Sequence, residues 1–72
     1  MKYFVCTITT TGKAYTANFI ERENAERHFF SCVACEDCKA CVIVDAENCT
    51  TVNLWEDGEI VIYNNERIYT KG

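Results

Sequence analysis

The chain has no proline and only three glycines among its 72 residues. It also lacks any stretch rich in proline, glycine or serine, any low-complexity run and any internal repeat, so nothing indicates a linker or a second domain. We therefore expect a single domain over residues 1–72. A domain of this size buries only a small core, and natural domains this small often gain stability from disulfides, a bound metal or a partner subunit.

Positive charge is also scarce, because seven Lys and Arg residues stand against eleven Asp and Glu, giving a formal net charge of -4. The basic residues are scattered, which argues against the clustered Lys and Arg that bind nucleic acid or anionic lipid. The chain has no apolar run long enough to cross a membrane and no secretory signal pattern. We expect no nucleic-acid partner, no membrane partner and a cytoplasmic location, where thiols stay reduced.

Several segments have the apolar alternation that is typical of β-strands. In "YFVCTITT" the apolar side chains alternate along the chain, and Gly12 in "TTGK" predicts a turn into a second strand. The segment "EDGE" predicts an Asp-Gly hairpin between two later strands. The predicted strands cover residues 3–10, 13–19, 41–46, 50–55, 60–63 and 67–70.

Between the second and third of these strands the apolar period changes to that of a helix beginning near residue 22. At about 100° per residue, Ala25, Phe29 and Cys32 fall within one arc, whereas Phe30 lies outside it and is a candidate contact for a partner. The acidic residues that follow disfavour a continued helix, so it should end near residue 33 or 35. The order β-β-α-β-β-β-β predicts an α+β fold, a mainly antiparallel sheet with one helix packed on one face.

Alternation with a period of two divides the predicted sheet into two faces. We expect the face under the helix to form the core: Phe4, Cys6, Ile8, Val42, Val44, Val52, Leu54, Ile60, Ile62 and Ile68. The other face has nothing in the chain to cover it and carries Tyr3, Val5, Trp55, Val61, Tyr63 and Tyr69. Such aromatic residues are enriched in interfaces, so this face is the predicted site for a protein partner or a homo-oligomer. Strand propensity and cross-strand pairing also explain the same residues.

Four of the six cysteines lie in "SCVACEDCKAC", each three residues from the next. On one continuous helix their sulfurs could not converge on a single ion, so a metal site requires the chain to fold back near residues 36–37. The spacing differs from the usual zinc pattern and is one residue short of the bacterial iron–sulfur pattern. The sequence favours zinc over an iron–sulfur cluster as the cofactor of such a site. Its candidate ligands are His28, Cys32, Cys35, Cys38 and Cys41.

A reading without any cofactor stays open, because a buried free cysteine packs as a small apolar side chain. On this reading Cys6 and Cys41 are packing residues in strands, while Cys49 lies accessible in a polar loop. The sequence has no motif that indicates an enzyme. It contains no phosphate-binding glycine loop, no nucleophile elbow and no HExxH motif, and His28 is the single histidine that could act as a base for a thiol nucleophile.

A thiol redox protein is the third reading, but its reactive cysteine would belong at a helix N-terminus, and these CxxC units lie at a helix end. The sequence therefore predicts a non-enzymatic interaction module with no catalytic residues. A small zinc-binding domain is the alternative.

Overall fold

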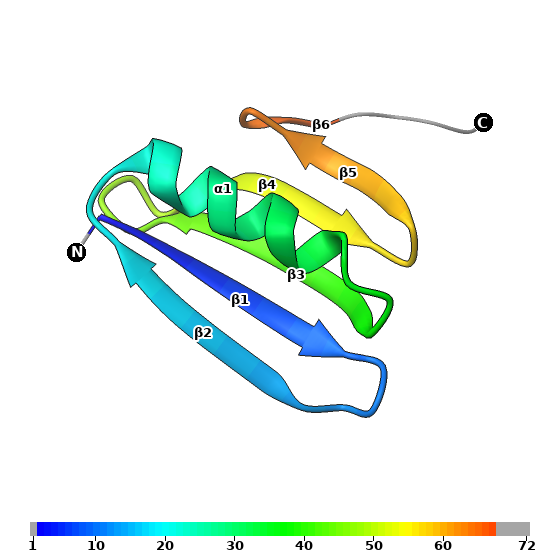
Figure 1. The fold of residues 1–72 in the computed structure, drawn as a ribbon. Helices are drawn as coiled ribbons and strands as arrows, with labels where there is room; N and C mark the ends of the chain where they lie inside the picture. The colour runs from blue at the N-terminus through cyan, green and yellow to red at the C-terminus, as the bar shows by residue number, and fades with distance from the viewer. Residues whose placement is uncertain (1, 68–72) are drawn as a thin grey trace.

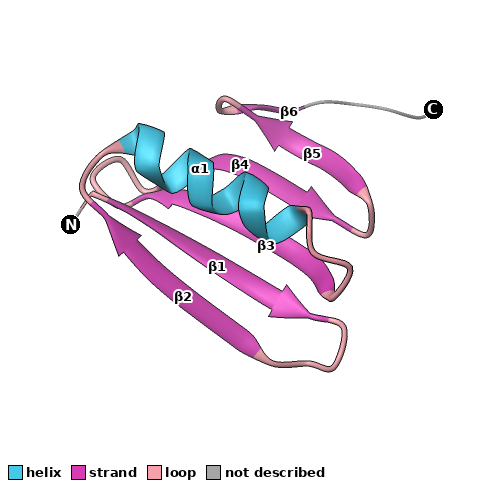
Figure 2. Cartoon of the chain, viewed as in Figure 1, coloured by secondary structure: helices cyan, strands magenta, loops and turns pink. Residues whose placement is uncertain are grey.

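The computed structural model describes residues 2–67 and shows a six-stranded antiparallel sheet with a helix packed across one face (Figure 1; Figure 2). The strand order in the sheet is β2-β1-β3-β4-β5-β6. The predicted α+β class and element order are therefore confirmed. The elements are β1 (Tyr3–Thr9), β2 (Ala14–Phe19), α1 (Arg22–Val33), β3 (Cys38–Asp45), β4 (Thr50–Glu56), β5 (Glu59–Tyr63) and β6 (Glu66–Arg67).

Helix α1 has the amphipathic pattern that its sequence predicts. Ala25 and Phe29, one turn apart, are fully buried against the sheet, and Phe30 is 42% exposed. The helix ends at Val33, as expected, and a hydrogen bond from the Cys35 N–H to the carbonyl of residue 32 closes a final tight turn (3.1 Å). Within the described residues, no helix has the length and apolar content needed to cross a membrane.

The two predicted glycine turns have the required backbone geometry. Gly12 has a φ of 91°, and the Asp57-Gly58 pair has φ values of 50° and 87°. Two successive positive φ angles are typical of the two-residue turn whose twist matches that of a β-hairpin. These turns set the β1–β2 and β4–β5 pairings.

The core lies between α1 and the sheet, which for β1 and β3 is the face opposite to the one predicted. Val5 and Ile43 are 1% and 0% exposed and pack with Phe29, whereas the predicted core residues Phe4 and Val42 are partly exposed on the other side. Along β1 and β3 alternation separated the two faces correctly, but both are apolar, so the pattern could not show which one the helix covers. Along β4 and β5, Val52 and Ile60 lie in or against the core as predicted, whereas Leu54 and Ile62 do not. The buried apolar residues are Val5, Ala25, Phe29, Cys38, Cys41, Ile43 and Val52.

Three register shifts interrupt the ladders, in β1–β3, β3–β4 and β4–β5. In β4 the shift places the neighbours Val52 and Asn53 on the helix side together, where they are 1% and 0% exposed. In β3 the shift allows pairing to continue back to Cys38. The strand therefore begins earlier than the predicted segment 41–46. In a bulge two residues oppose one, so the apolar alternation with a period of two is interrupted and does not indicate the additional paired residues.

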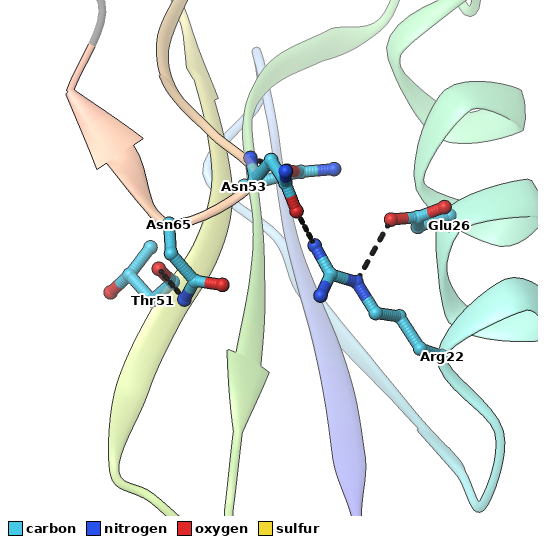
Figure 3. Close-up of polar contacts among 6 residues, drawn as sticks. Arg22, Glu26, Thr51, Asn53 and Asn65 are labelled. Carbon is cyan, nitrogen blue, oxygen red and sulfur yellow. Dashed lines mark hydrogen bonds and ion pairs between the residues drawn. The ribbon is translucent and has the colours of Figure 1, made fainter.

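Polar contacts connect the β5–β6 turn to the rest of the sheet and to the helix. Asn53 Oδ1 accepts a hydrogen bond from the Asn64 N–H (2.9 Å), and the Asn65 N–H donates to a β4 carbonyl (2.8 Å). Figure 3 shows Arg22 reaching from α1 toward this turn, where it donates to the Asn64 side chain and to Glu26 (3.0 Å). The Nδ2 of buried Asn53 has no hydrogen-bond partner among the described residues.

Candidate functional site

The sheet face opposite α1 carries a continuous apolar surface. Cross-strand pairing puts Cys6 beside Val42, Val42 beside Leu54, and Leu54 beside Ile62, so one apolar row crosses β1, β3, β4 and β5. Directly opposite residues on neighbouring strands share a face. We call this surface the open face; its members, all partly exposed, are Phe4, Cys6, Ile8, Val42, Val44, Leu54 and Ile62.

The residues predicted for an uncovered aromatic face lie elsewhere. Val5 is buried under α1, and Tyr3 and Trp55 pack against the same core, so their prediction as surface contacts is wrong. Along β1 the reason is the reversed choice of face, and along β4 it is the bulge at Val52, which puts Trp55 on the helix side and Leu54 on the other. On β5, Val61 is partly exposed and Tyr63 is 47% exposed. The sixth residue of the predicted face, Tyr69, lies outside the described residues.

The open face has no charged side chain at its centre. The protein measures 30 × 29 × 17 Å, and the short dimension is that of one helix on one sheet. Along β2, which borders the open face, Thr16 pairs with Cys6 and Asn18 pairs with Phe4, so polar side chains line this edge. A second row of the open face starts at Ile8, which is opposite Ala40. Ala40 is in turn opposite Glu56, so this row ends at a carboxylate.

On the helix side of the sheet, four cysteines come together at the end of α1. Cys32 and Cys35 lie three residues apart at the helix end and therefore share a side of it. Cys38 and Cys41 are also three apart, a spacing that puts residues of a regular strand on opposite faces. The β3 bulge corrects this: Cys38 pairs with Thr9 and Cys41 with Thr7, and all four of these residues are buried on the helix side.

We call Cys32, Cys35, Cys38 and Cys41 the cysteine cluster. Three of them, with Thr7, Thr9, Tyr15 and Asp37, line an open depression of about 190 Å³. The fourth, Cys41, is 1% exposed and shares a hydrogen bond with the Thr7 hydroxyl (3.3 Å). The loop that carries the cluster is held in place by Thr10, whose hydroxyl donates to the Asp37 carboxylate (2.8 Å) and whose N–H donates to the Asp37 carbonyl (2.9 Å).

The local environment favours the protonated form of two of these thiols. Burial raises the pKa of Cys41 to about 11, and the neighbouring Cys32 and Cys38 add to the shift. Burial likewise raises the pKa of Cys38, helped by the charges that Cys32 and Cys35 would carry. A thiol with a raised pKa is a poorer nucleophile at neutral pH, because little thiolate is present. These values count against Cys38 and Cys41 as redox nucleophiles.

The predicted metal ligands are close together but not disposed around an ion. The Sγ of Cys32 lies 3.5 Å from the Nε2 of His28, whose ring packs against Phe19 at a centroid distance of 5.3 Å. Cys35 and Cys38 each donate to a nearby backbone carbonyl at 3.6 Å. Within the part of the chain that the structure describes, no three Cys, His, Asp or Glu side chains are arranged to ligate one ion.

The two remaining cysteines lie apart from the cluster. Cys49 is exposed in the turn between β3 and β4, as the sequence indicates. Cys6 was expected to be a packing residue in the core, but it is partly exposed at the centre of the open face. All six cysteines are free thiols in the structure.

Comparison with known proteins adds no information on either site. The chain matches no family model, no curated protein and no solved structure. Function must therefore be inferred from the open face and the cysteine cluster themselves.

Proposed function

We propose that this protein is a non-enzymatic interaction module that binds a second copy of itself through the open face. One observation carries the proposal: seven apolar side chains lie in register across four strands on a face that no described element covers. The sequence predicted an interface formed by aromatic residues, and our proposal instead uses the mainly aliphatic residues of the open face. We place the module in the cytoplasm, which suits six free thiols.

An apolar open face is unusual for an antiparallel sheet with a single helical layer. Such sheets normally have one apolar face and one polar, solvated face. Here β3 has Ile43 on the helix side and Val42 and Val44 on the other. Covering apolar surface contributes roughly 25 cal/mol per Å² removed from water. The 30 × 29 Å breadth of the protein is of the order of the ~800 Å² that each partner contributes to a standard interface.

A second copy fits this face better than a partner of different chemistry. The centre of the open face has no charged side chain that could select a complementary charge pattern, and the apolar face of a sheet can pack on its own copy about 10 Å away. Thr16 and Asn18 along β2 would lie at the polar rim that interfaces commonly have. Because each chain carries a net charge of -4, the two copies repel, and added salt should strengthen their association.

Sedimentation velocity over a wide range of protein concentration, under reducing conditions, tests the proposal. The native chain should convert from monomer to dimer as concentration rises, with a lower midpoint at higher salt. The double variant Val42→Thr/Leu54→Thr replaces two apolar residues of the central row by a polar residue of high strand propensity, and should shift the midpoint at least tenfold upward. Ile20→Thr is the control, since Ile20 is 69% exposed outside the open face. A native chain that stays monomeric throughout contradicts self-association.

Alkylation of the cysteines gives an independent readout within one molecule. Cys6 lies in the central row of the open face, whereas Cys49 is exposed in a distant turn. Dimerisation should therefore slow the labelling of Cys6 relative to Cys49 as protein concentration rises, as measured by peptide mass spectrometry. A Cys6 to Cys49 ratio that does not change while a dimer forms would show that the dimer uses another surface.

A further inference from the structure

We propose that the cysteine cluster is a binding site for one thiophilic divalent cation, with Zn²⁺ as the ion and the thiolates of Cys32, Cys35, Cys38 and Cys41 as ligands. The site lies on the helix side of the sheet, away from the open face, and is independent of self-association. It requires reduced thiols, and all six cysteines of the chain are free.

The fold resolves the objection that the sequence spacing raises. Four cysteines at steps of three cannot converge on one helix, but here two lie at the end of α1 and two lie in β3. The turn at residues 34–37 folds the chain back, and the β3 bulge turns Cys38 and Cys41 to the same face. One CxxC pair therefore faces another across the helix–sheet boundary, which is the donor set of a structural zinc site.

Contacts among the four thiols show that they are close. Cys32, Cys35 and Cys38 line one depression, and Cys41 lies near Cys32 and Cys38 on the same side of the sheet. Four thiolates held this close together would repel one another. A divalent cation removes this repulsion, because each thiolate then faces a positive ion instead of another negative sulfur.

Binding requires side-chain rotation, since no three of the described ligand-type side chains now surround a common point. The present partners hold the thiols weakly: Cys35 and Cys38 donate to carbonyls at 3.6 Å, and Cys32 contacts the His28 ring at 3.5 Å. On binding, four S–H bonds break, four protons pass to solvent, and four Zn–S bonds form with no change in oxidation state. Affinity should therefore fall as pH falls.

Co²⁺, a spectroscopic substitute for Zn²⁺, is the probe in the first experiment. Reduced full-length protein, freed of reductant under anaerobic conditions, is titrated with Co²⁺ and then with Zn²⁺. We expect thiolate-to-cobalt charge-transfer absorption and the ligand-field band of a tetrahedral site, saturating at one ion per chain and disappearing when Zn²⁺ displaces Co²⁺. Absence of thiolate charge transfer, or a spectrum typical of oxygen ligands only, would overturn the proposal.

Three variants identify the sulfurs. Cys35→Ser changes an exposed cluster residue with little risk to the core, and it should lower Co²⁺ affinity about a hundredfold or more. Cys49→Ser and Cys6→Ser, both outside the cluster, should leave the spectrum and the affinity unchanged. Far-ultraviolet circular dichroism verifies that each variant is folded before titration. If Cys35→Ser binds as tightly as the native chain, or if Cys49→Ser abolishes the band, the cluster is not the site.

Discussion

The choice of the face that α1 covers can be tested with two valines. Val5 lies in β1 on the helix side and is 1% exposed, whereas Val42 lies in the adjacent β3 on the open face and is partly exposed. Both occupy interior strands, so a change to alanine costs each a similar amount of strand propensity, at most about 1 kcal/mol. The difference between the two variants therefore reports burial.

The magnitudes follow from what each methyl group contacts. Val5→Ala removes two buried methyl groups, at about 0.8 kcal/mol each, and leaves a cavity beside Phe29, for a total of about 2–3 kcal/mol. Val42→Ala leaves no cavity in the monomer and should cost about 1 kcal/mol or less. A domain of this length has an unfolding free energy of only about 4–11 kcal/mol, so the Val5 variant should lose a large share of it.

Urea unfolding followed by Trp55 fluorescence provides the measurement, because Trp55 packs against the core and is the single tryptophan. The experiment uses protein dilute enough to be monomeric, so that association does not add to the stability of the Val42 site. If Val42→Ala costs as much as Val5→Ala or more, the helix covers the other face. The open face would then not exist, and the proposed self-association would lose its basis.

Two further predictions concern the helix and the buried thiol. Phe29→Ala should lower the unfolding free energy by about 3–5 kcal/mol, because Phe29 is fully buried. Phe30→Ala should lower it by only about 1 kcal/mol, through loss of the edge-to-face contact between the two rings at 5.1 Å. Equal losses of unfolding free energy in urea would contradict the observed orientation of α1. Burial raises the pKa of Cys41 from 9.0 to about 11, so above pH 9 the unfolded chain loses this proton before the folded chain does. The unfolding free energy should be unaffected by this group below pH 9 and should fall by about 2–3 kcal/mol by pH 11. In Cys41→Ala the unfolding free energy should fall by about 2–3 kcal/mol less between pH 9 and pH 11 than in the native chain. An equal fall in the variant would show that Cys41 is not the group responsible.

The elements themselves could be predicted from local sequence. The helix over 22–33 follows from the spacing of Ala25 and Phe29, and the β4–β5 hairpin follows from Asp57-Gly58, whose positive φ angles are a local requirement. The starting point of β3 could not be predicted in this way. A bulge is stabilised by pairing with a partner strand distant in sequence, and its own residues show no period that identifies it.

For the candidate sites, the cysteines were visible in the sequence but their arrangement was not. The set His28, Cys32, Cys35, Cys38 and Cys41 was predicted from ligand chemistry, and the structure brings its four sulfurs to one end of α1. Thr7 and Asp37 were missed, because they reach the cluster through strand pairing and through a loop contact with Thr10. Neither contact can be predicted from the local spacing of residues, because each joins residues far apart in the sequence.

By itself the sequence determined the order of helix and strands, the two-residue turns and the division of β1 and of the predicted part of β3 into two sides, because these depend on backbone sterics and on the local spacing of apolar residues. Only the tertiary structure decided which side the helix covers. Val5 and Ile43 on one side and Phe4 and Val42 on the other are all apolar, so hydrophobicity alone gives both faces a similar tendency to be buried. The packing of Phe29 and the bulges in β3 and β4 decide which face is buried, and no described element covers the open face.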